Sequence, residues 1–259
     1  MKTKEVGLWT RPTSIGTMMI ITTNYTSISS LTIGFRQNNK LADEVAMFTD
    51  ENFWMLNPKC RDIFRRIPYD TPENQAKQKC GIDIEVGRMK IDEKVKVKNC
   101  LNIPLEKTSF ELFHHGPKLG WFLKPESETT HYAFITLSCQ TGIGENEVAH
   151  DNITTADYCL VQKEGFVRHL EEHYGITMES LEDDARLFYL KKNAGSFAVR
   201  EYAPINGDGH TLYLTFSRFS ENGRRTNATN LVFYMEDLRR LPFVRTIRIA
   251  RRNWKQICN

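Results

Sequence analysis

Two histidines one helical turn apart occur in the segment His169-Leu170-Glu171-Glu172-His173. Residues at positions i and i+4 of a helix lie on one face, so His169 and His173 could share a zinc ion. Glu172, in the same turn, could act as general base toward a metal-bound water. We expect a solvated helix face here and no cofactor. Zinc as cofactor and hydrolysis as reaction are the alternative that this spacing allows.

The H-x-x-E-H pattern of His169, Glu172 and His173 resembles the signature of the inverzincin metallopeptidases. The resemblance covers these five residues of the 259. It implies a metal-assisted hydrolase in which the two histidines bind zinc and Glu172 is catalytic. The surrounding sequence identifies no third ligand. Among the isolated histidines, His210 in Gly207-Asp208-Gly209-His210 is the best candidate for an acid or base role.

Positive charge is concentrated near the C-terminus. The whole chain carries 35 basic and 32 acidic side chains and a net charge of +3, whereas residues 224–255 alone contain nine basic and two acidic ones. Each phosphate that a basic side chain neutralises releases counterions, so such a segment suits an anionic partner. The residues expected to contact nucleic acid are Arg224, Arg225, Arg239, Arg240, Arg245, Arg248, Arg251 and Arg252. An ion-paired or solvated face is the alternative.

Aromatic residues are interleaved with some of these arginines, as in Phe233, Tyr234, Arg239 and Arg240. Aromatic side chains on a sheet with arginine at its margin can stack and hold single-stranded nucleic acid. The leading hypothesis is therefore a non-enzymatic binding or assembly protein that contacts RNA, or an acidic protein surface, within a larger complex. A metal-assisted hydrolase is the first alternative, and a secreted or lumenal β-rich ligand-binding protein with disulfides is the second.

Composition narrows the class of protein. Apolar residues make up 40% of the chain and charged residues 26%, values of an ordinary globular protein. The longest apolar run near the N-terminus, Met18-Met19-Ile20-Ile21, is far shorter than the roughly 20 residues that cross a bilayer, so we expect no membrane span. The six cysteines form no C-x-x-C pair. We expect reduced thiols in a soluble, intracellular protein, with secretion as the alternative.

Hydrophobic periodicity predicts an α+β fold with largely antiparallel sheets and a central helical pair. Residues 89–98 alternate between apolar and charged side chains, which is typical of a strand with one buried and one wet face. The other expected strands span 15–23, 27–35, 109–114, 121–124, 131–139, 197–203, 211–219, 230–235 and 244–250. Helices are expected over 41–47, 60–67, 73–79, 162–174 and 177–192.

The polar segment 141–151, with Gly142 and Gly144, is the expected boundary between two parts of the chain. Residues 1–140 would form a β-rich region with short helices. Residues 152–259 would carry the helical pair and four basic strand-like runs. One continuous domain is the alternative.

Overall fold

The computed structural model of the chain describes residues 40–68, 70–95, 106–114, 118–144, 147–221 and 224–258. The strands expected over 15–23 and 27–35 lie outside these residues. Both sheets of the structure take strands from either side of segment 141–151. The division into residues 1–140 and 152–259 stays a prediction.

Sheet A has seven strands in the described part of the chain, in the order β1-β2-β3-β6-β7-β11-β12. Neighbouring strands are antiparallel except β3 and β6, which are parallel. The strands are β1 (Phe64–Arg66), β2 (Ile84–Val86), β3 (Met89–Val95), β6 (His131–Cys139), β7 (Ile153–Gln162), β11 (Val244–Ala250) and β12 (Asn253–Cys258).

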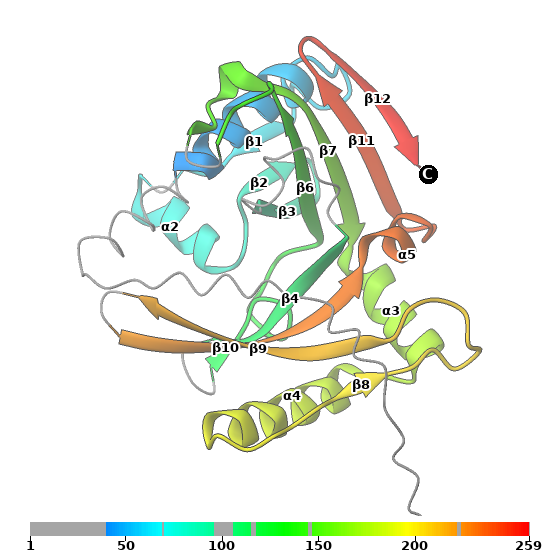
Figure 1. Cartoon of the computed structure of the whole chain (residues 1–259). Coiled ribbons are helices and arrows are strands. Elements are labelled where there is room, and N and C mark those ends of the chain that lie inside the picture. The colour runs from blue at the N-terminus through cyan, green and yellow to red at the C-terminus, as the bar shows by residue number, and fades with distance from the viewer. Residues whose placement is uncertain are drawn as a thin grey trace, which may run out of the picture.

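Sheet B has five described strands, all paired antiparallel, in the order β5-β4-β10-β9-β8. They are β4 (Lys107–His114), β5 (Lys118–Leu119), β8 (Glu201–Tyr202), β9 (Leu212–Glu221) and β10 (Arg224–Tyr234). In Figure 1 the long strands β9 and β10 run across the lower part of the molecule, and sheet A rises above them. The predicted α+β fold with largely antiparallel sheets is confirmed.

The central helical pair consists of α3 (Lys163–Tyr174) and α4 (Met178–Asn193). Gly175 ends α3 in the left-handed conformation, with φ of 67°, and its N–H donates to the carbonyl of Glu171. The Thr177 side chain begins α4 by accepting a hydrogen bond from the Ser180 N–H. Both caps were expected from the sequence. Helix α4 packs against β4, β9 and β10 and lies below sheet B in Figure 1.

Two hydrophobic cores lie on opposite faces of sheet A. The core between the sheets is rich in aromatic rings, among them Phe110, Tyr132, Phe134, Phe166 and Phe233. The ring centroid of Phe110 in sheet B is 4.7 Å from that of Tyr132 in sheet A and 5.0 Å from that of Phe166 in α3, so aromatic contacts join the two sheets and α3. The other face is covered by a helix over residues 40–49 and the π-helical turn η1 (Asp50–Trp54).

Because sheet A is covered on both sides, the wet face expected for residues 89–98 was wrong at Asp92, while residues 96–98 lie outside the described residues. Strand β3 does alternate, and Ile91 packs in the core beside η1. The opposite face looks toward sheet B, and Asp92 on that face is only 3% exposed. A charged residue has therefore been placed where the sequence pattern predicts contact with water.

Two further expected elements were also wrong. Residues 60–67 form turns followed by β1 rather than a helix, since Phe64–Arg66 pairs with β2. Residues 121–124 form a turn rather than a strand, with the N–H groups of Leu123 and Lys124 donating to the Gly120 carbonyl. Residues 153–162 and 253–258, for which no element was expected, are β7 and β12.

Two short helices complete the described structure. Helix α2 (Pro72–Lys79) begins at Thr71, whose side chain accepts from the Asn74 N–H, as the proline position predicts. Helix α5 (Met235–Arg239) follows β10 directly and was not expected. None of the helices in the described ranges is long and apolar enough to cross a membrane.

Candidate functional site

Asp83 and Asp92 lie opposite each other on the β2–β3 hairpin. Ile84 pairs with Ile91 in this hairpin. Asp83 immediately precedes the first of these residues, Asp92 follows the second, and the Asp83 N–H donates to the Ile91 carbonyl at 2.9 Å. Residues that face each other across an antiparallel pair project their side chains to the same side. Two carboxyl groups thus share one place between the sheets.

Burial dominates the electrostatics of this pair. Burial, reinforced by the neighbouring Asp92, raises the pKa of Asp83 to about 7. The pKa of Asp92 is also raised, again chiefly by burial. Oδ2 of Asp92 is buried and has no N–H or hydroxyl donor beside it. A hydrogen bond with Asp83 opposes the rise in the pKa of Asp92, and such a bond requires that one of the two carboxyl groups be protonated. An ionised Asp92 carboxylate would have too few hydrogen-bond donors and cations around it, whereas buried polar atoms are ordinarily paired.

Lys94 supplies the nearest positive charge. It lies two residues beyond Asp92 on the same face of β3, and its Nζ is 2.7 Å from Oδ1 of Asp92. Although burial opposes the charge, the carboxylates of Asp92 and Asp83 raise the pKa of Lys94 above its ordinary value. The Lys94 side chain is 34% exposed, so the site opens to solvent on this side.

Two further charged residues, from β4 and α3, lie close to the site. Glu111 of β4, on the facing sheet, is close enough to contribute to the raised pKa of Lys94. Lys163, the first residue of α3, is half-buried. Burial lowers the pKa of Lys163, while the charge of Asp92 opposes this effect. The site therefore lies between sheet A, sheet B and the start of α3.

The strand that carries Asp92 and Lys94 is anchored from its other face. Glu93 points into the opposite core, where Arg66 Nη1 donates to its Oε2 at 2.6 Å and the Tyr158 hydroxyl donates to its Oε1 at 2.9 Å. Arg66 also binds both carboxylate oxygens of Asp50 at 2.6 Å. The Glu93 N–H donates to Asp83 Oδ2 at 2.8 Å. One network thus holds the backbone of β3 and the carboxylate of Asp83.

The turn before Asp83 is also fixed. Gly81 has φ of 77°, a conformation that favours glycine. A Cβ at this position would lie 2.6 Å from Oγ1 of Thr129, whose hydroxyl donates to the Gly81 carbonyl. The turn therefore requires glycine both for its backbone conformation and for its contact with Thr129.

The chemistry of this arrangement makes it a candidate for binding a cation. Two carboxylates with one lysine carry a net negative charge when all are ionised, and one carboxylate oxygen is unpaired. Hard divalent cations such as Mg²⁺ prefer oxygen ligands and are often held by one or two carboxylates. The sequence analysis missed this site. The signal was present in the alternation of residues 89–98, but locating it requires knowing that the charged face is covered.

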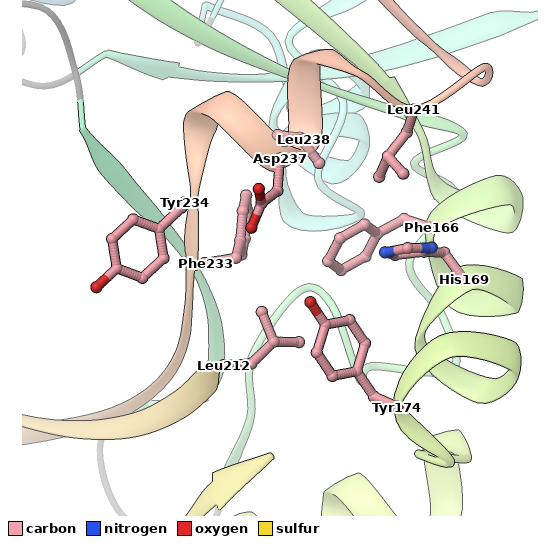
Figure 2. A pocket seen from close by; sticks show the side chains of 9 residues that line it. All are labelled: Phe166, His169, Tyr174, Leu212, Phe233, Tyr234, Asp237, Leu238 and Leu241. Carbon is pink, nitrogen blue, oxygen red and sulfur yellow. The ribbon is translucent and has the colours of Figure 1, made fainter. Parts of the chain in front are cut away.

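The histidine helix lies at a different place. His169 faces a small pocket between α3 and α5 that is lined mainly by apolar side chains, among them Phe166, Leu212, Phe233 and Leu238 (Figure 2). Burial, with the adjacent His173, lowers the pKa of His169 to about 4, so its ring is neutral at physiological pH.

His169 and His173 do lie together, as the motif predicts, with ring centroids 4.9 Å apart. Nε2 of His173, however, donates to the Asp208 carbonyl at 2.7 Å, and Glu172 is exposed to solvent. Asp237 is the acidic residue that shares the pocket with His169. The zinc site on this helix stays a prediction.

His210 belongs to a cluster at the rim of this pocket. Its Nδ1 is 2.9 Å from Oδ2 of Asp237, and its Nε2 is 3.2 Å from Oε1 of Glu236. The ring stacks on Tyr234 at 4.0 Å. Potential ligand atoms of His210, Glu236 and Asp237 lie within 4.8 Å of one another. The two carboxylates already pair with the two ring nitrogens, so these contacts account for His210 by a structural role.

The arginines expected to bind nucleic acid differ in the contacts they make. Arg248 is paired with Asp157 through two contacts of 2.6 and 2.7 Å. Arg251 donates to the His150 carbonyl, and Arg252 occupies the β11–β12 turn with φ of 53°. Arg240 and Arg245 are exposed, and within the described part of the chain neither has an ion-pair partner.

Three arginines of the set remain: Arg239, Arg224 and Arg225. Arg239 is partly buried, and its Nε has no hydrogen-bond partner. The side chains of Arg224 and Arg225 lie outside the described residues.

Cys60 and Cys80 are free thiols.

No protein-family model, no curated protein and no solved structure matches this chain. The class of site is therefore defined by its geometry alone: a buried carboxylate pair with a lysine, placed between two sheets.

Proposed function

We propose that this protein hydrolyses phosphodiester bonds in nucleic acid, using a divalent cation held by Asp83 and Asp92. The observation that carries the proposal is the buried pair of carboxyl groups of Asp83 and Asp92, in which Oδ2 of Asp92 has no donor beside it when both groups are ionised. A cation between the two carboxylates would supply the charge that this place lacks.

The small number of protein ligands supports a phosphate substrate. Mg²⁺ keeps several positions for water and is commonly bound by one or two carboxylates together with substrate phosphates. A site with Asp83 and Asp92 leaves such positions open. When bound, the cation would lower the pKa of a coordinated water and offset charge on the phosphate oxygens.

Lys94 fits the same reaction. Its raised pKa keeps it protonated, so it serves as a source of positive charge rather than as a base. Its side chain is 34% exposed, and its ammonium group could contact an incoming phosphate oxygen. The network of Arg66, Glu93 and Tyr158 would keep Lys94 and Asp92 in place during the reaction.

Nucleic acid is preferred over a small phosphate ester because of the basic C-terminal segment. The exposed side chains of Arg240, Arg245 and Arg252 could contribute phosphate contacts, because no ion pair competes for them among the described residues. RNA, the partner expected from the sequence, becomes one of two substrates to test, with DNA as the other.

The test compares cleavage of labelled single-stranded and double-stranded RNA and DNA in Mg²⁺, Mn²⁺ and EDTA. We expect cleavage that requires the cation and falls by roughly 100-fold or more in Asp83→Asn, Asp92→Asn and Lys94→Met. Asp62→Asn is the matched control, because the Asp62 side chain is 79% exposed and lies outside the site.

Cleavage that persists unchanged in Asp92→Asn would assign the activity to a contaminant or to another site. Binding of nucleic acid without any cleavage, and without binding of Mg²⁺ by calorimetry, would overturn the proposal. That result would favour the non-enzymatic role expected from the sequence.

A further inference from the structure

The outer face of α4 carries an apolar stripe that nothing in the proposed reaction uses. Leu187 and Leu190 are 52% and 57% exposed, although the helix also buries Leu181, Ala185 and Phe188 against sheet B. A surface helix ordinarily places polar residues on the face away from the core. Helix α4 is therefore apolar on both sides over its second half.

The neighbouring segment extends this surface. The residues before β8 run beside α4 in Figure 1, where the Ser196 N–H donates to the Lys191 carbonyl and Arg200 Nε lies 2.8 Å from Oδ2 of Asp184. Phe197 and Val199 of this segment are 88% and 61% exposed. Clustered exposed apolar side chains of this kind mark interaction surfaces.

Charges on α4 indicate what covers the stripe. Asp183, Leu187 and Lys191 are four residues apart in succession and form one ridge on the exposed side of the helix. The ridge has a carboxylate at one end, an ammonium group at the other and a leucine in the middle. In the described structure neither Asp183 nor Lys191 takes part in an ion pair.

Such a ridge is complementary to its own antiparallel copy. If two α4 helices pack across a two-fold axis with Leu187 at the centre, Asp183 of each copy lies at the level of Lys191 of the other. The two apolar stripes then cover each other, and both charges acquire partners. An unrelated partner would have to reproduce this pattern.

We infer that the outer face of α4 is the interface of a symmetric homodimer, with Leu187 and Leu190 at its centre and two Asp183–Lys191 pairs at its ends. The helical stripe is small compared with obligate interfaces, so the dimer should form reversibly with increasing concentration. The inference does not depend on the proposed hydrolysis, because α4 packs on sheet B and supplies no side chain to the carboxylate site.

The experiment is analytical ultracentrifugation of the full chain over a wide concentration range. We expect the mass to rise from that of the 30.1 kDa monomer toward twice this value. Leu187→Glu combined with Leu190→Glu should leave a monomer at all concentrations. Circular dichroism and thermal unfolding show whether this variant folds.

Charge exchange tests the antiparallel arrangement without removing apolar contacts. Asp183→Lys and Lys191→Asp, each alone, should raise the dissociation constant about three- to tenfold, because each places like charges together twice. The double variant Asp183→Lys/Lys191→Asp should restore the dissociation constant of the native dimer. Glu73→Lys on α2, which is also exposed, is the control and should change nothing.

Three results would overturn the inference. The native chain could stay monomeric at every concentration. A dimer could survive the two leucine substitutions. The double charge exchange could fail to recover the dimer affinity that the single changes lose.

Discussion

Asp83 and Asp92 lie beside each other at the end of the β2–β3 hairpin, and burial raises the pKa of both carboxyl groups. Like charges directly opposite on a strand pair ordinarily destabilise it. The protein keeps both carboxyl groups in a buried place and adds one lysine. This relationship, rather than any motif in the sequence, is what identifies the candidate site.

Cation binding should stabilise the folded chain. A ligand that binds only the native state raises stability in proportion to the logarithm of its concentration. At saturating Mg²⁺ we expect the melting temperature to rise by roughly 5 °C or more. Asp92→Asn should abolish this rise relative to its own metal-free melting temperature, because it removes one of the two carboxylates that bind the cation. A similar rise in both proteins would place the cation elsewhere.

The pH dependence of stability should reflect Asp83. Its pKa in the folded protein is about 7, above its ordinary value of 3.8, so between these values the native state binds the proton and the unfolded state does not. This carboxyl group therefore stabilises the metal-free protein fully below pH 3.8, and the contribution is lost as the pH rises through 7. The contribution of Asp83 to the free energy of unfolding is at most about 4 kcal/mol.

Urea unfolding at pH 5 and pH 8 in EDTA, for the native chain and Asp83→Asn, measures this contribution. The native chain should lose more stability than the variant on going to pH 8. Cation binding should show the opposite trend and tighten as the pH rises, because the ligand must be deprotonated. An identical pH profile for the two proteins would contradict the assignment.

Gly81→Ala should disturb both stability and cation binding. Its φ of 77° strains any other residue, and a Cβ would lie 2.6 Å from Oγ1 of Thr129. We expect a loss of about 1–3 kcal/mol in unfolding free energy and a smaller Mg²⁺-induced rise in melting temperature. Gly142→Ala is the control: φ is 87° there, but no atom lies within 4 Å of the added Cβ. Equal effects at both positions would show that backbone conformation alone matters.

Arg66 should be one of the most sensitive positions for stability. Arg66→Met leaves the buried carboxylates of Asp50 and Glu93 without their cation, at an expected cost of roughly 3–5 kcal/mol in urea unfolding. Arg61→Met is the control, because its pair with Asp62 is exposed and should contribute about 0–1 kcal/mol. A small loss in both variants would mean that the network does not hold β3.

The arginines of the C-terminal segment should contribute unequally to nucleic-acid binding. Arg248 is already engaged by Asp157, whereas Arg245 is exposed. In an Asp92→Asn background, Arg245→Gln should reduce the slope of log affinity against log salt by up to about 0.7 on a single strand, and Arg248→Gln by less. Fluorescence anisotropy at several KCl concentrations measures both slopes. Equal reductions would show that Arg248 leaves Asp157 to bind phosphate.

Local sequence determined a good part of the architecture. The capped ends of α3 and α4, the strands at His131–Cys139 and Val244–Ala250 and the α+β class follow from periodicity, glycine position and capping side chains. These signals depend on neighbouring residues only, so one sequence is enough to find them. The motif on α3 likewise placed His169 and His173 side by side.

Tertiary structure alone decided where the charged face of β3 would lie. Alternation predicts that Asp92 and Lys94 share a face, but whether water or other elements cover that face depends on β4 and on the start of α3, which are distant in sequence. The same long-range packing turned residues 64–66 into an edge strand and gave Arg66 its two carboxylate partners. Burial is a property of the whole fold, and it is burial that makes two ordinary aspartates into a candidate cation site.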